Sequence, residues 1–248
     1  MVEKLKLTLR RLEWLLLLKT VVFAGLLFLT SLTKSWWLVL FGIIYSAWLY
    51  NKDFKRGQNK CFYSFSFFVI ASQFFLFSVG GDLLPLSISL FFGLMLYLAI
   101  GSRFFVFEEH KIFWSIFYYL LAFIIFGILG YFFSGGLMLW GMTLVFVFFF
   151  LTAKEYLVYF MDEVKTNKRE NLFLLVGAFL ISQVFILVQF LDIGFLNASC
   201  LILIFLIAML DLLISYFSGI LNSETIKRNI IFFLFFNILV LGLATILF

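Results

Sequence analysis

The sequence has very few of the residues that build metal sites, disulfides and broken helices. Among its 248 residues are one histidine (His110), two cysteines (Cys61 and Cys200) and one proline (Pro85). One imidazole and two thiols cannot supply the four ligands of a structural zinc site or the four thiolates of an iron–sulfur cluster. A single proline leaves few proline-broken helices of the kind that many transporters place at their substrate sites. We therefore expect this chain to hold no metal and no other cofactor by itself.

Charge is also scarce, whereas apolar residues are abundant. Charged residues make up 12% of the chain and hydrophobic residues 65%, while soluble domains typically have about 25% and 45–50%. The mean hydropathy is +1.17. A soluble protein of this size cannot hide so much apolar surface from water. The composition predicts an all-α, polytopic integral membrane protein whose first partner is the lipid bilayer, and its formal net charge of +5 indicates orientation rather than binding to nucleic acid.

Nine apolar runs are long enough, or nearly so, to cross a hydrocarbon core about 30 Å thick as helices. They are continuous runs rather than ten-residue alternations, which favours a helical bundle over a barrel. Short polar breaks alternate with longer charged ones, so we expect four helical hairpins plus a ninth helix in a single membrane domain, residues 1–248. The expected spans are residues 12–31, 35–50, 61–79, 83–100, 112–130, 137–153, 171–190, 196–216 and 230–248.

The basic residues predict the orientation of the chain. Short cytoplasmic loops collect Lys and Arg because these residues are rarely translocated. With the N-terminus in the cytoplasm, 18 − 1 = 17 of the 18 Lys and Arg residues fall in cytoplasmic segments, and only Lys34 falls outside. We therefore expect a cytoplasmic N-terminus and an external C-terminus, with a bacterial inner membrane as the setting.

The beginning of the chain is the least regular part of this plan. Residues 1–18 place leucines on one helical face and Lys6, Arg10 and Glu13 elsewhere, which is typical of an amphipathic helix at a membrane surface. We expect this basic helix to lead into the first span, with a possible turn between them. Because Lys19 interrupts the apolar run, the span could start at Leu12 or at Thr20.

Two ionisable residues fall inside the expected spans, and such residues are costly in a bilayer. Lys19 and Asp211 both lie in the cytoplasmic half of the membrane by this plan. Two interpretations stay open. The residues form a salt bridge that joins the first helix to the eighth, or Lys19 reaches the interface while Asp211 is protonated or bonded to Ser215.

Three amides lie near the middle of expected spans: Gln73, Gln183 and Asn237. A buried amide can line a polar pathway, although it more commonly forms a hydrogen bond between helices. Small residues four apart permit close helix packing, and we interpret three such pairs as packing seams: Gly42/Ser46, Ser89/Gly93 and Ala178/Ser182.

The densest polar cluster is Glu108-Glu109-His110, at the cytoplasmic end of the fifth span. Two carboxylates beside an imidazole can perform acid–base chemistry, but the same residues fit an ordinary solvated loop, which we favour.

These features leave three classes of function open. We favour a non-catalytic accessory or assembly subunit, or a scaffold, whose partners are lipid and other membrane subunits. The first alternative is a small-solute or ion transporter with Asp211 as a protonatable site. The second is a lipid-modifying enzyme that works at the inner interface through Glu108 and Glu109.

Overall fold

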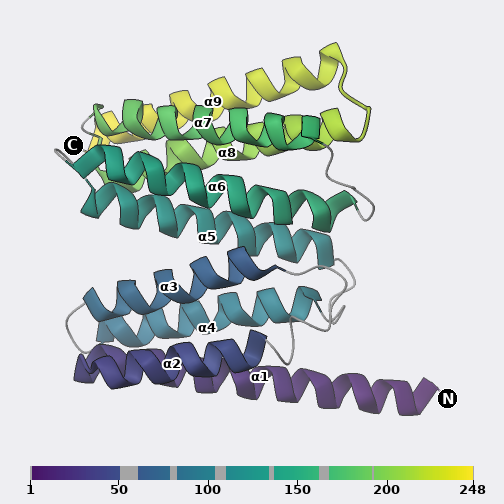
Figure 1. Cartoon of the computed structure of the whole chain (residues 1–248), viewed down its shortest axis with the longest axis vertical. Helices are drawn as coiled ribbons and strands as arrows, with labels where there is room; N and C mark the ends of the chain where they lie inside the picture. Colours follow the sequence, from purple (N-terminus) through teal and green to yellow (C-terminus); the bar gives the residue numbers. More distant parts are fainter. Residues whose placement is uncertain are drawn as a thin grey trace. The chain divides into compact units, whose positions relative to one another are not determined.

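The computed structural model describes residues 2–50, 61–78, 83–103, 110–133, 137–161, 168–191 and 193–247. This part of the chain is helical, with short turns and no strand (Figure 1). The helices are α1 (Val2–Thr33), α2 (Trp36–Leu49), α3 (Phe62–Ser78), α4 (Leu83–Arg103), α5 (His110–Phe132), α6 (Met138–Met161), α7 (Lys168–Gln189), α8 (Phe195–Phe217) and α9 (Ser223–Leu247). The predicted all-α helical membrane bundle is confirmed.

Each expected span corresponds to one of these helices. Among the described residues, seven helices are long and apolar enough to cross a membrane, and the shorter apolar helices are α2 and α3. They have 14 and 17 residues, or about 21 Å and 26 Å of helix at 1.5 Å per residue. The chain is therefore a multi-span membrane protein.

The first helix runs without interruption from Val2 to Thr33. A turn between a surface helix and the first span is therefore absent, and the N-terminal turns of α1 extend past α2 (Figure 1). The apolar stretch long enough to span a membrane covers Trp14–Thr33, which includes Lys19. This start is close to the earlier of the two expected positions.

The sixth helix extends beyond the expected span of residues 137–153. It continues past Ala153 to Met161, and the membrane-length apolar window covers Met138–Phe160. The sequence predicts that the charged segment from Lys154 continues this helix, and helical spacing keeps Glu155 on one face with two buried residues, Thr152 and Tyr159.

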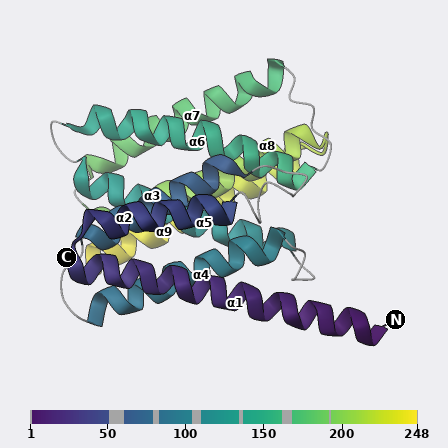
Figure 2. The ribbon, with the colours of Figure 1, turned by 60° about the horizontal axis from the view of Figure 1, so that its bottom comes forward.

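Packing divides the chain into two compact units, Met1–Tyr118 and Tyr119–Phe248, with the boundary inside α5. In unit 1, α1 packs along α4 and also contacts α2 and α3 (Figure 2). Phe68 of α3 is fully buried at the centre of this unit. Its ring centroid lies 5.8 Å from that of Phe23, 6.1 Å from that of Phe92 and 5.6 Å from that of Phe117. Large rings from four helices thus supply the apolar core.

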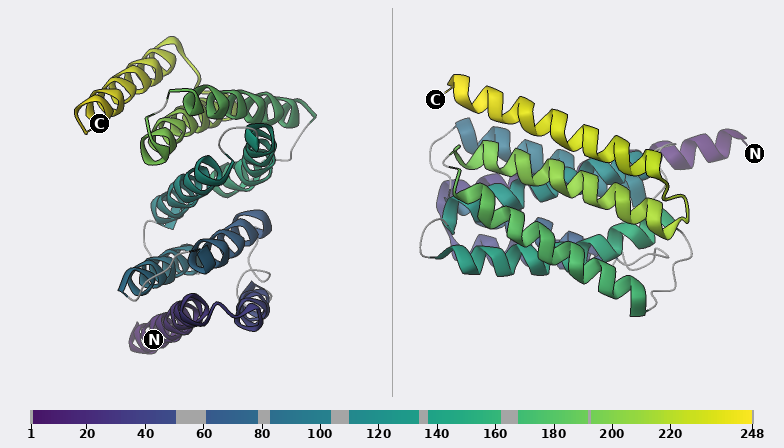
Figure 3. Two further views of the ribbon diagram at one scale, coloured as in Figure 1. Left: turned by 90° about the vertical axis from the view of Figure 1, so that its left-hand side faces the viewer. Right: turned by 90° about the horizontal axis from the view of Figure 1, so that it is seen from above.

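In unit 2, α7 packs on both α6 and α8, and α9 packs on α8. Phe126 of α5 meets Phe148 of α6 edge to face, with ring centroids 6.0 Å apart, and both side chains are fully buried. Figure 3 shows α9 at the edge of this unit. The ring of Phe233 on α9 lies 5.7 Å from that of Phe205 on α8.

The predicted packing seams are buried. Gly42, Ser46, Ser89, Gly93, Ala178 and Ser182 all lie inside their units. At Gly93 the neighbouring helix is so close that an added Cβ would lie 3.0 Å from the Cβ of Ala24 and 3.4 Å from the backbone oxygen of Thr20. The absence of a side chain at Gly93 is therefore what lets α4 approach α1.

Candidate functional site

A polar cluster joins the last two helices of unit 2. The carboxylate of Asp211 on α8 accepts a hydrogen bond from Asn229 Nδ2 at 2.6 Å and one from Arg228 at 3.2 Å, and the latter is also a salt bridge. Asn229 in turn donates to the backbone oxygen of Thr225 at 3.1 Å. Asp211 therefore has two partners on α9, and Ser215 is not one of them.

The hairpin geometry explains why these residues meet. Asp211 lies 217 − 211 = 6 residues before the last residue of α8, and Asn229 lies 229 − 223 = 6 residues after the first residue of α9. Residues equally far from the turn of an antiparallel hairpin lie at the same depth. The start of α9 is fixed by Asn222, whose Oδ1 accepts from the backbone nitrogen of Thr225 at 2.8 Å and from its hydroxyl at 2.9 Å. This arrangement is an N-cap that satisfies a free N–H of the first turn.

The two bonds of Asp211 differ in their surroundings. Asn229 is 7% exposed, whereas the Arg228 and Asp211 side chains are 70% and 41% exposed. Exposed ion pairs contribute about 0–1 kcal/mol because water and salt screen them. The hydrogen bond from the buried Asn229 amide stabilises the hairpin more than the ion pair does, because loss of its acceptor would leave a buried polar group without this hydrogen bond.

Lys19 belongs to unit 1 and Asp211 to unit 2, so the salt bridge between them stays a prediction. Lys19 is half-buried on α1, and its backbone oxygen accepts a hydrogen bond from the hydroxyl of Tyr45 on α2 at 3.2 Å. The Lys19 segment is thereby tied to α2.

A second polar cluster, at the C-terminal part of α6, was missed at the level of sequence. Glu155 is 8% exposed and Tyr156 is 2% exposed. The hydroxyl of Tyr156 lies 3.0 Å from that of Tyr119 on α5, within hydrogen-bonding distance. The signal in the sequence was the spacing of Thr152, Glu155 and Tyr159 on one helical face, all of which are buried. An acid buried in a membrane-length helix belongs with Lys19 and Asp211 as a candidate functional residue.

The three predicted amides lie in different surroundings. Gln73 is 4% exposed, and neither atom of its amide has a hydrogen-bond partner. Its amide lies against Gly42 of α2, where a side chain would collide with it. Gln183 is half-buried on α7. Asn237 on α9 is also half-buried, and its Nδ2 donates to the backbone oxygen of Phe233 at 2.6 Å.

The acidic cluster of the sequence falls mainly outside the described part of the chain. Glu108 and Glu109 are not among the described residues. His110 is the first residue of α5, and its side chain is likewise not described. The interfacial acid–base site therefore stays a prediction.

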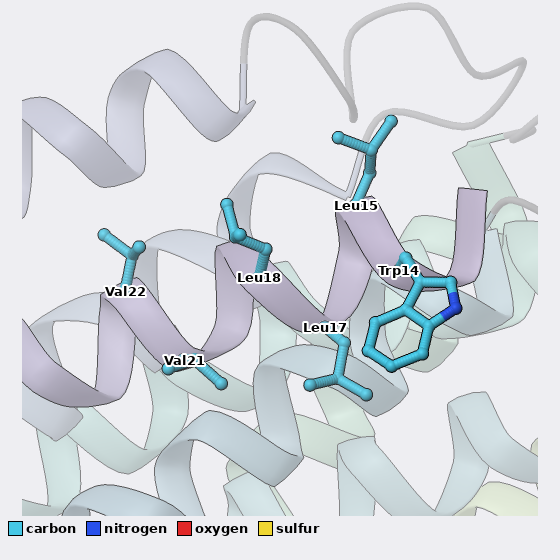
Figure 4. Close-up of a pocket in the computed structure, with 6 residues that line it drawn as sticks. All are labelled: Trp14, Leu15, Leu17, Leu18, Val21 and Val22. Atoms are coloured by element: carbon cyan, nitrogen blue, oxygen red, sulfur yellow. The ribbon is translucent and has the colours of Figure 1, made fainter. Parts of the chain in front are cut away.

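Three grooves on unit 1 have apolar linings. One lies along α1 alone, and Figure 4 shows its six residues projecting outward from that helix, with Leu15 and Leu18 on one edge and Leu17 and Val21 on the other. A groove of about 270 Å³ lies between α1 and α4, and one of about 510 Å³ lies between α2 and α3. Apolar grooves on membrane-spanning helices fit lipid chains rather than polar solutes.

Within the residues that the structure describes, no three His, Cys, Asp or Glu side chains come together as a metal site requires. Comparisons with models of protein families, with curated proteins and with solved structures found no match.

Proposed function

We propose that this protein is a non-catalytic membrane subunit, which acts through contacts of its helices with lipid and with another membrane-embedded helix. In this proposal the chain has a cytoplasmic N-terminus and lies in a bacterial inner membrane. Its partner meets α9. A fold alone does not determine function. The proposal therefore rests on which surfaces of the helices are free to contact lipid or another protein.

The observation that carries the proposal is the exposure of α9. Of its apolar window, Ser223–Gly242, 6% is buried, against 39–50% in the other six membrane-length helices. Large apolar side chains project from several sides of it, including Ile231 at 67% and Ile238 at 70% exposed. A helix so sparsely packed on its own bundle has most of its surface free for lipid or a partner helix.

The polar groups of the spans support contact rather than transport. Asp211 is engaged by Arg228 and Asn229, which is a fastening arrangement for the α8–α9 hairpin. The grooves described above are apolar, whereas a solute pathway needs groups that replace water around the solute. We therefore favour the subunit function over the alternative, which is transport with Asp211 as a protonatable site.

Site-specific photo-cross-linking in native membranes tests the proposal. A photoreactive amino acid is introduced at Ile230 or Leu234 of α9, and at Leu90 or Leu94 of α4 as matched controls. The exposed fractions are 52% for both α9 positions, and 60% and 55% for the controls. We expect one protein adduct of constant mass from α9 and lipid adducts from α4. Lipid adducts from all four positions would contradict a partner on α9.

A flux measurement distinguishes the subunit function from transport through Asp211. The purified full chain is reconstituted into vesicles that contain a pH-sensitive dye. Proton flux is then compared between the natural sequence and the Asp211→Asn variant. The proposal expects no difference in proton flux between them. A flux that Asp211→Asn abolishes would establish transport instead.

A further inference from the structure

One flank of α9 carries a regular row of three exposed apolar residues and one half-buried amide, which we name the α9 seam: Ile230, Leu234, Asn237 and Leu241. Their successive spacings are four, three and four residues, the pattern of the a and d positions of a coiled coil. The three apolar members are 52%, 52% and 38% exposed. The seam lies beside the face that packs on α8, where Asn229 is buried.

Asn237 is unusual on such a surface. It lies nine residues beyond Arg228, or about 14 Å along the helix, which is near the middle of a hydrocarbon core about 30 Å thick. One N–H of its amide is used by the backbone oxygen of Phe233. Within the described part of the chain, the amide oxygen accepts no hydrogen bond, and an amide has one further N–H to donate. Lipid can satisfy neither group.

We infer that the α9 seam pairs with the same seam of a second copy of this chain, with Asn237 opposite Asn237. This rests on the proposed function and identifies its partner. A carboxamide is complementary to itself, because the free N–H of each can donate to the oxygen of the other. Two copies in one membrane have the same orientation, so a two-fold axis along the membrane normal brings their Asn237 residues together at one depth. The heptad spacing then packs the leucines and isoleucine of both seams around the pair.

A second row of this kind lies on α7 and serves as a matched control. Val176, Leu180, Gln183 and Leu187 repeat the same spacings, and the apolar members are 45%, 41% and 63% exposed. However, α7 is packed between α6 and α8, and 39% of its window is buried against 6% for α9. Because α7 packs on two helices of its own unit and α9 on one, α7 has less free surface for a second copy of the chain.

Disulfide cross-linking of the full chain in phospholipid vesicles tests which side of α9 meets its copy. In a background of Cys61→Ala and Cys200→Ala, Leu241→Cys is compared with Leu239→Cys. These positions are 38% and 43% exposed, but they lie two residues apart and therefore face opposite sides of the helix. We expect a cross-linked dimer from Leu241→Cys and none from Leu239→Cys. The reverse pattern would overturn the inference.

Energy transfer between labelled copies at increasing lipid dilution measures the role of the amide. We expect Asn237→Leu to weaken dimerisation about three- to twenty-fold, the range of interhelical hydrogen bonds in membranes, and Gln183→Leu to leave it unchanged. Asn237→Gln, which keeps the carboxamide, should restore most of the loss. A monomer at every dilution, or a dimer that Gln183→Leu alone weakens, would overturn the inference.

The two proposals fail in different ways. If α9 cross-links to a different protein in native membranes while the purified chain is monomeric, the second copy is excluded and the subunit function stands. If α9 yields only lipid adducts in native membranes, the subunit function fails as well.

Discussion

The ammonium group of Lys34 lies against the C-terminal end of α3, with its Nζ 2.6 Å from the backbone oxygen of Phe77 and 3.3 Å from that of Leu76. The last carbonyls of a helix lack partners within the helix and carry partial negative charge. Lys34 also lies over the ring of Phe77, 5.8 Å from its centroid. Its backbone has a positive φ of 49° between α1 and α2. The one basic residue predicted on the outer side thus ties the α1–α2 turn to α3.

Replacing Lys34 tests this tie. Lys34→Met keeps the approximate length of the side chain but removes its charge, and we expect it to lower the free energy of unfolding by about 0.3–1 kcal/mol, the usual range for a cation at a helix C-terminus. The ring of Trp36 is tilted against that of Phe77, with ring centroids 4.6 Å apart, so its fluorescence should report the loosened contact. Lys34→Arg, which keeps the charge, should change stability little; an equal loss would show that charge is not the cause.

The two bonds of Asp211 should be separable by mutation. We expect Asn229→Leu to destabilise the α8–α9 hairpin by about 1–3 kcal/mol, because it leaves a partly buried carboxylate without its closest donor. Arg228→Gln should cost less than about 1 kcal/mol, because the ion pair is exposed. Unfolding in detergent micelles measures both. High salt should remove the Arg228 effect and leave the Asn229 effect, and the opposite order would contradict the assignment of strengths.

The close approach of α1 and α4 depends on Gly93. Gly93→Val would place side-chain atoms where the Cβ of Ala24 and the backbone oxygen of Thr20 lie, and we expect a loss of about 1–3 kcal/mol, typical of overpacking. Gly25 on α1 is the matched control, because an added Cβ there meets nothing within 4 Å. Gly25→Ala should be neutral or stabilising. Equal losses from both variants would indicate a general effect of replacing glycine rather than helix contact.

Replacing Gln73 is expected to stabilise the protein, whereas the variants above destabilise it. Because neither of its amide atoms has a partner, we expect Gln73→Met, which keeps an unbranched chain of similar length, to raise the free energy of unfolding by about 1–2 kcal/mol. The half-buried Gln183 is the control, and Gln183→Met should change stability by less than about 0.5 kcal/mol. A clear loss for Gln73→Met would show that the amide makes a polar contact that stabilises unit 1.

Sequence reasoning located every helix because each apolar run is long and bounded by polar residues. It ended the sixth membrane span at Ala153 because Lys154 and Glu155 are charged, and it did not recognise that the helical face that includes Glu155 is buried. It also placed Arg228 with the interfacial basic residues and so missed it as a partner of Asp211. Asp211 and Asn229 are equally far from the hairpin turn in the sequence. This spacing predicts a contact between them only when the ends of α8 and α9 are known.

The tryptophans at the two ends of α2 have a consequence for the surrounding bilayer. Trp37 and Trp48 are 80% and 48% exposed, and their separation of 48 − 37 = 11 positions amounts to about 17 Å of helix. Indole rings settle at the level of the lipid headgroups, yet an ordinary hydrocarbon core is about 30 Å thick. We therefore expect a thinner bilayer beside α2, where lipids with short tails fit better than lipids with long ones.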